Sequence, residues 1–160
     1  MVVGMETERL IGAALCARSW HLAVAESCTG GLLGHLITQI PGSSDYFWGG
    51  TIVYTNALKR TLLQVDAGVL ERWGAVSSQV ALEMARGVCC VTGAEVGLGI
   101  TGIAGPGGAT PQKPVGLTYI GLATPGESWA WRHVWDGDRA ANKEFSARAA
   151  LAHLLYYLRG

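Results

Sequence analysis

Long apolar runs and clusters of like charge are both missing from this sequence of 160 residues. Gly, His or charged residues interrupt every apolar stretch well before the roughly 20 residues that a bilayer-spanning helix requires. Twelve basic residues balance twelve acidic ones, and no Lys/Arg run provides the basic surface that nucleic-acid binding needs. We therefore expect neither a membrane nor a nucleic-acid partner.

The four cysteines lack the spacing of a CxxC motif or of a zinc site. We predict reduced thiols, no metal and no cofactor. The first residues, Met1 to Glu8, include two acids and lack the apolar centre of a signal peptide. The expected location is cytoplasmic.

What the sequence does contain is 49% apolar residues and six Trp, with 15% charged residues. This composition supports a full hydrophobic core and excludes intrinsic disorder. Because domains cluster at roughly 100 to 200 residues, we expect residues 1–160 to form a single domain.

Apolar periodicity predicts alternating helices and strands. We expect helices over residues 6–18 and 32–40, a short one capped by Asn56, one capped by Ser77 or Ser78, and one after Asp138 whose apolar stripe is Phe145, Ala149, Ala152, Leu155 and Tyr156. The expected strands are 21–25, 48–55, 95–100, 115–123 and 128–135, with a hairpin turn at 124–127. This order predicts an α/β fold, a layered α/β/α sandwich with a mixed sheet of about five or six strands including an antiparallel hairpin.

Two glycine-rich segments invite a nucleotide-binding interpretation. The segment Gly97–Gly102 matches G-x-G-x-x-G, but it lies within a predicted strand and a Gly/Pro-rich loop follows it, so no helix opens there. The loop itself, residues 101–114, lacks the offset of a Walker phosphate loop. Neither segment predicts a dinucleotide or Walker site, although a loop of this length is usually functional or disordered.

Ser27 lies between a predicted strand and the Gly-rich start of a helix. Free main-chain N–H groups at such a position bind anions, which makes Ser27 a candidate nucleophile. The alternative is that Ser27 or Thr29 only caps the helix, and this segment alone favours the cap. Cys28 is another candidate nucleophile, but a cysteine needs a paired base and buried free cysteines are common.

Lys59 is the remaining candidate for a base, because the four histidines form no motif and no G-x-S-x-G surrounds Ser27. As a base, Lys59 would need its pKa lowered from about 10.4 towards 7, a cost of about 4 to 5 kcal/mol. The alternative is an ordinary solvated lysine, with Tyr54 in the core.

Trp129, Trp131 and Trp135 alternate along one predicted strand and therefore share a face. Core packing explains most of this pattern, and a subunit interface is the alternative. Asp138 is predicted to cap the last helix, which leaves Arg139 either solvated or directed at a ligand phosphate.

Several segments, taken together and in order, resemble the CinA C-terminal domain family across almost the whole chain. They are residues 25–31 (AESCTGG), 41–44 (PGSS), 54–59 (YTNALK), 74–77 (GAVS), 101–106 (TGIAGP), 113–116 (KPVG) and 137–139 (GDR). The family includes amidases that convert nicotinamide mononucleotide (NMN) to nicotinate mononucleotide and ammonia. Its larger members carry an additional N-terminal domain, for which we expect no room here.

The resemblance implies that Ser27 is the nucleophile, Lys59 the general base and Tyr54 a group that orients the pair or relays the proton. Cys28, Thr29, Gly30 and Gly31 are then expected to supply oxyanion or phosphate donors. The substrate would also contact Thr101, Gly102 and Arg139 under a closing loop. NMN is the expected small-molecule partner, and a homo-oligomer, most simply a dimer, is the expected assembly.

This sequence departs from the family pattern at two places near the expected site. The stretch that usually reads Tyr-Ser-Asn-Glu-Ala-Lys is altered at Thr55 and Leu58, with no Glu between Asn56 and Lys59. Gly107 takes the place of an acid in the loop. Two other functions stay open: a catalytically silent nucleotide-binding or regulatory module linked to competence or DNA damage response, and a scaffold whose Trp-rich strand binds a partner.

Overall fold

Helices and strands alternate along the chain in the computed structural model, which describes residues 5–160. The helices are α1 (Glu6–Arg18), α2 (Leu32–Thr38), α3 (Asn56–Leu63), α4 (Ala67–Trp73), α5 (Ser78–Thr92) and α6 (Arg139–Arg159), with one 3₁₀ turn at Ser43–Asp45. The strands are β1 (Leu22–Glu26), β2 (Phe47–Ile52), β3 (Val96–Gly102), β4 (Leu117–Thr124) and β5 (Glu127–Val134).

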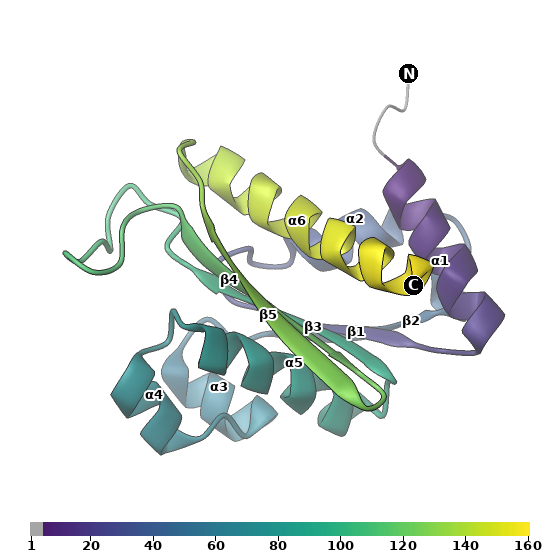
Figure 1. Cartoon of the computed structure of the whole chain (residues 1–160), viewed down its shortest axis with the longest axis horizontal. Coiled ribbons are helices and arrows are strands. Elements are labelled where there is room, and N and C mark those ends of the chain that lie inside the picture. Colours follow the sequence, from purple (N-terminus) through teal and green to yellow (C-terminus); the bar gives the residue numbers. More distant parts are fainter. Residues whose placement is uncertain (1–4) are drawn as a thin grey trace.

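All five strands form one mixed sheet in the order β2-β1-β3-β4-β5. Helices α1, α2 and α6 cover one face and α3, α4 and α5 cover the other (Figure 1). Each face has its own apolar core: Leu15, Ile37 and Leu154 belong to the first, and Leu63 and Met84 to the second. The predicted layered α/β/α architecture with a mixed sheet is confirmed.

Strand direction brings the site together. Strands β1, β2 and β3 run parallel, whereas β4 is antiparallel to both β3 and β5, so the predicted hairpin is one of two antiparallel pairs. Glu26 at the end of β1 pairs with Ile100 of β3. The residues that follow, Ser27 and Thr101, therefore emerge at the same edge of the sheet.

Glycines in β3 and β4 let α5 pack directly on the sheet. A Cβ on Gly97 would lie 2.1 Å from the carbonyl oxygen of Ala85, and one on Gly99 would lie 2.4 Å from that of Ala81. A Cβ on Gly121 of β4 would lie 2.3 Å from the same Ala81 oxygen, so β4 approaches α5 equally closely. The G-x-G pattern is thus a helix-packing feature, in agreement with the rejection of a dinucleotide site.

The structure differs from the sequence-based prediction at two helices. Helix α4 was not predicted; it is a short segment capped by Asp66, whose side chain accepts from the N–H of Val69. The predicted stripe of α6 has the wrong phase, since Phe145 is 42% and Tyr156 83% exposed. The buried residues of α6 are Asn142, Ser146, Ala147, Ala150, Leu151, Leu154 and Leu158. Polar residues lie in this buried face because they are hydrogen-bonded: Ser146 Oγ lies 3.0 Å from Thr118 Oγ1.

Helix caps were predicted with mixed success. Asp138 caps α6 and Ser77 caps α5, as expected. The cap of α3 is Thr55, whose side chain accepts from the N–H of Leu58, so the assignment to Asn56 is wrong by one residue. The shift occurs because Asn56 already has helical geometry and forms the first residue of α3.

Trp129 and Trp131 of β5 and Trp135, the residue after β5, pack against side chains of α6. Trp131 stacks on His153 with ring centroids 4.0 Å apart, Trp129 packs against Tyr157, and Trp135 against Phe145. The core-packing interpretation therefore accounts for this face of β5. Among residues 5–160, no helix is both long and apolar enough to cross a membrane.

Candidate active site

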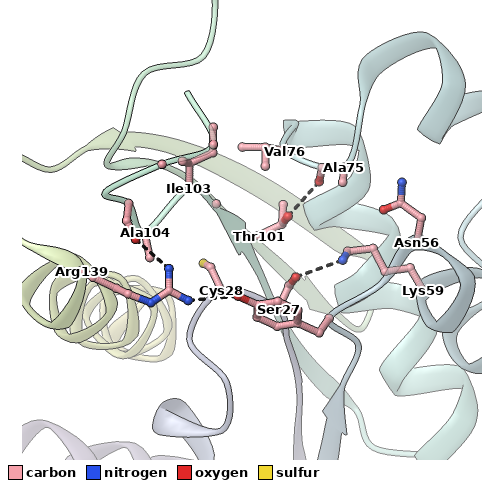
Figure 2. A pocket seen from close by; sticks show the side chains of 15 residues that line it. Ser27, Cys28, Asn56, Lys59, Ala75, Val76, Thr101, Ile103, Ala104 and Arg139 are labelled. Atoms are coloured by element: carbon pink, nitrogen blue, oxygen red, sulfur yellow. Dashed lines mark hydrogen bonds between the residues drawn. The ribbon is translucent and has the colours of Figure 1, made fainter. Parts of the chain in front are cut away.

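Ser27 and Lys59 meet although 32 positions separate them in the sequence. Ser27 directly follows β1, and its N–H donates to the carbonyl of Ile100 in β3, which fixes the serine at the sheet edge. Lys59 comes from α3, a helix that the Thr55 cap starts after β2. Its Nζ lies 3.0 Å from Ser27 Oγ (Figure 2).

The surroundings of Lys59 favour its neutral form. Its side chain is only 1% exposed, and Nζ donates to the buried carbonyl of Val53 at 2.8 Å. No carboxylate of residues 5–160 forms an ion pair with it. Burial therefore lowers the pKa of Lys59 from its ordinary value. A neutral amine beside a serine hydroxyl can accept the hydroxyl proton.

A cavity of about 260 Å³ opens over this pair. Of the predicted site residues, Ser27, Cys28, Tyr54, Lys59, Thr101, Gly102 and Arg139 line it. The structure adds residues that were not in the predicted set: Asn56, Ala75, Val76, Ile103, Ala104, Gly105, Gly107 and Gly108. Several of these belong to the segments that carried the family resemblance, and that was the one signal in the sequence that could have located them.

The expected anion site at the start of α2 is occupied by the protein itself. The carboxylate of Glu26, a side chain only 1% exposed, accepts three main-chain N–H groups. Gly31 and Leu33 donate to Oε2 at 3.0 and 3.1 Å, and Gly34 donates to Oε1 at 2.9 Å. These are the donors that a phosphate would otherwise use at a helix N-terminus. Neither Ser27 nor Thr29 caps this helix.

Thr29, Gly30 and Gly31 lie apart from the other predicted site residues. None of them lines the cavity, and the N–H of Gly31 is held by Glu26. The N–H of Gly30 closes the turn by donating to the carbonyl of Ser27 at 3.1 Å. The reason is topological: the chain turns away from the cavity after Cys28 and enters α2.

Cys28 lines the cavity beside Ser27 but is a poor nucleophile. The side chain is 7% exposed, and burial raises the pKa of its thiol to about 12. Because the thiolate is the reactive form, this cysteine stays neutral and unreactive at ordinary pH.

Tyr54 and Arg139 meet across the mouth of the cavity. The guanidinium donates from Nη2 to the hydroxyl of Tyr54 at 3.0 Å and from Nη1 to the carbonyl of Gly105 at 2.7 Å. Among the described residues, the Tyr54 hydroxyl has no hydrogen bond to Ser27 or Lys59. Through these two hydrogen bonds Arg139 links the loop after β3 to the segment before α3. Tyr54 therefore lies at the rim of the cavity.

Thr101 and Gly102 form the wall of the cavity at the end of β3. Thr101 is 1% exposed, and its hydroxyl donates to the carbonyl of Ala75 at 2.8 Å, which ties β3 to the segment before α5 (Figure 2). A Cβ on Gly102 would lie 2.7 Å from Thr118 Oγ1 and 3.1 Å from Cys28 Sγ. Only glycine fits at position 102 without displacing this wall.

Comparison with known proteins places this chain in a family. The model of the CinA C-terminal domain matches residues 5–158. The chain belongs to the CinA C-terminal domain family. A CinA-like protein of Salinibacter ruber is 49% identical over 144 residues, which are 90% of this chain and 35% of that protein. The chain spans about a third of the length of such curated relatives.

Solved structures of the family share the fold over nearly their whole length. A CinA superfamily protein of Klebsiella pneumoniae superposes with a TM-score of 0.93 at 32% identity, covering 97% of each chain. The competence/damage inducible protein of Agrobacterium tumefaciens gives a TM-score of 0.92 at 37% identity, covering 98% of this chain and 95% of that one.

The departures from the family pattern lie at the outer side of the site. Ala57, which takes the place of the usual acid, and Leu58 are exposed, whereas the adjacent Lys59 is buried. Gly107 lines the cavity, and a Cβ there would meet nothing within 4 Å. Ala57 and Leu58 lie outside the lining of the cavity, so only the missing acid at Gly107 changes the charge of that lining. The contact between Ser27 and Lys59 is intact.

Proposed function

We propose that this chain is an amidase that hydrolyses the carboxamide of NMN to nicotinate mononucleotide and ammonia. The observation that carries the proposal is the 3.0 Å contact between Ser27 Oγ and the buried amine of Lys59 at the floor of a cavity. This amine forms no ion pair with an acid of residues 5–160. Binding alone does not require a nucleophile next to a candidate base. Membership of a family that includes such amidases supports the same function.

In the proposed reaction, neutral Lys59 takes the proton of the Ser27 hydroxyl while Oγ attacks the carboxamide carbon. The N–H of Cys28, the residue after the nucleophile, is the proposed donor to the resulting oxyanion. The ammonium of Lys59 then returns a proton to the leaving nitrogen, ammonia departs, and an acyl ester forms on Ser27. A water molecule attacks this ester, Lys59 again takes and returns a proton, and the acid product leaves.

The carbonyl of Val53 keeps the amine aligned throughout this cycle, because it accepts a hydrogen bond from Nζ in either protonation state. The pyridinium of NMN is itself a cation. Its arrival beside Lys59 would disfavour the ammonium form, so substrate binding would help to keep the base neutral.

Ammonia release from NMN by the purified protein tests the proposal. We expect Ser27→Ala and Lys59→Ala each to lower the rate by at least about a hundredfold. The matched controls are Ser44→Ala and Arg60→Ala, both at exposed positions, the second on the same helix as Lys59. Circular dichroism checks that every variant is folded.

Two outcomes would count against the amidase. Ammonia release that survives both active-site substitutions would remove Ser27 and Lys59 from the mechanism. Binding of NMN by the wild type without any ammonia would favour a nucleotide-binding module, and restoring acids at Ala57 and Gly107 would be the next test.

A further inference from the structure

The loop between β3 and β4 forms part of the cavity although most of it faces solvent. Residues 106–112 of this loop are all exposed, and two of them, Gly107 and Gly108, line the cavity. We call residues 106–112 the strap. Because the strap supplies part of the lining, the position in which it is held determines the shape of the cavity and the access to it.

On the side of α6, two side chains hold the start of the strap. Arg139 donates to the carbonyl of Gly105 at 2.7 Å, and Asn142, which is only 1% exposed, donates to the carbonyl of Ala104 at 3.0 Å. Ala104 and Gly105 are themselves buried. This end of the strap therefore belongs to the packed structure.

On the side of α4, a single side chain holds the other end. Nζ of Lys113, the residue after the strap, donates to the carbonyl of Trp73 at 2.6 Å. Trp73 is the last residue of α4, and a helix C-terminus presents unpaired carbonyls that attract a cation. Among residues 5–160, no other hydrogen bond joins residues 106–113 to α3, α4 or α5. The two ends of the strap are thus held unequally.

The Lys113 contact also reaches the wall of the cavity. Trp73 is followed by Gly74 and then by Ala75, which lines the cavity across from Arg139 (Figure 2). Gly74 has a φ of +74°, and a Cβ there would lie 2.9 Å from Lys113 Nζ, so glycine leaves the ammonium room to reach the helix end. One amine therefore joins the strap to the segment that forms the opposite wall.

We propose that Lys113 is the latch of the strap and thereby a positioning residue for the cavity. With its bond to Trp73 made, the strap lies against the cavity; with the bond broken, the strap moves away from α4 while its α6 end stays in place. A single exposed hydrogen bond breaks and re-forms without disturbing the core. The glycines at positions 105, 107 and 108 give the backbone the freedom that this movement requires. The inference concerns access to the cavity, whichever ligand binds there.

Proteolysis of the folded protein measures how often the strap is open. When opening and closing are fast relative to cleavage, the cleavage rate follows the population of the open form. Losing a hydrogen bond to a charged group should raise that population by about ten- to a hundredfold. We therefore expect dilute proteinase K to cleave the strap of Lys113→Met at least about ten times faster than that of the wild type, with the sites mapped by mass spectrometry. Lys113→Arg should be cleaved at close to the wild-type rate, because Arg also donates to a carbonyl.

Arg72→Met is the matched control, because it removes an exposed cation beside the Trp73 ring and leaves the bond from Lys113 in place. Its strap should be cleaved at the wild-type rate. Equal cleavage of Lys113→Met and the wild type would overturn the latch. Faster cleavage throughout Lys113→Met, together with a lower urea midpoint, would overturn it too, since Lys113 would then only stabilise the fold.

A second comparison separates the latch from the proposed function. In the Ser27→Ala background, where NMN is not consumed, saturating NMN should slow cleavage of the strap, because a ligand held beneath it lowers the open population. Cleavage that NMN does not slow would count against NMN as the ligand and hence against the proposed function. The ligand-free comparison of Lys113→Met with the wild type would still decide the latch.

Discussion

Replacing Glu26 by Gln tests whether this buried carboxylate organises the turn that holds Ser27. The two carboxylate oxygens accept N–H groups from Gly31, Leu33 and Gly34 at 3.0, 3.1 and 2.9 Å. Gln has nearly the same shape, but only one of its two end atoms accepts a hydrogen bond. Its amide nitrogen would face at least one main-chain donor, so one or two of the three hydrogen bonds must be lost.

The magnitude follows from these contacts. A hydrogen bond to a charged group contributes about 1.5–3 kcal/mol, so losing one or two of them gives a destabilisation of about 2–5 kcal/mol. That is a large share of the roughly 5–15 kcal/mol by which folded proteins are stable. Because the turn also carries the nucleophile, ammonia release should fall even where the variant remains folded.

Urea unfolding followed by circular dichroism measures the effect through the midpoint of the transition. Glu144→Gln is the matched control, because Glu144 pairs on the surface with Arg148 and its loss should cost less than about 0.5 kcal/mol. If Glu26→Gln were no more destabilising than this control, the three hydrogen bonds would not hold the turn, and the start of α2 would again be open to a ligand.

Two further predictions concern Lys59 and Tyr54. Burial lowers the pKa of Lys59 in the folded state, so the unfolded chain binds more protons between that lowered pKa and the ordinary value near 10.5. Stability should therefore rise with pH across this window in the wild type, and the rise should be smaller in Lys59→Met; equal slopes in urea unfolding at several pH values would contradict the lowered pKa. Tyr54→Phe removes a hydroxyl that bonds to Arg139 and not to the Ser27–Lys59 pair, so ammonia release should fall by less than about tenfold. A loss as large as that of Lys59→Ala would instead make Tyr54 a proton relay.

The sequence predicted the layers of the fold well because their signals are local. Helix α1 was placed at its observed ends, and the five strands were all found, since apolar periodicity and turn residues report on neighbouring positions. The missed helix α4 is only seven residues long and buries a single side chain, Leu70, so it leaves little periodic signal.

Errors arose where a buried face is polar. The apolar pattern of α6 favours a stripe through Phe145 and Tyr156, but the sheet receives Asn142 and Ser146 instead. Asn142 donates to the carbonyl of Ala104 at 3.0 Å, a contact made across 38 positions. A hydrophobicity pattern cannot anticipate such a partner. Burying a polar side chain costs free energy unless it is hydrogen-bonded, and the partner is brought into reach only by the folded structure.

The amino-acid sequence by itself determined the α/β class, the strand-turn-helix position of Ser27 and the candidacy of Lys59. Only the tertiary structure decided that these two side chains meet and that Lys59 is buried with no counter-ion from the described part of the chain. It also decided that Glu26, and not a ligand, binds the start of α2. The physical reason is that strand order and register bring distant segments to one sheet edge, and charge pairing and burial at that edge depend on every element that packs there.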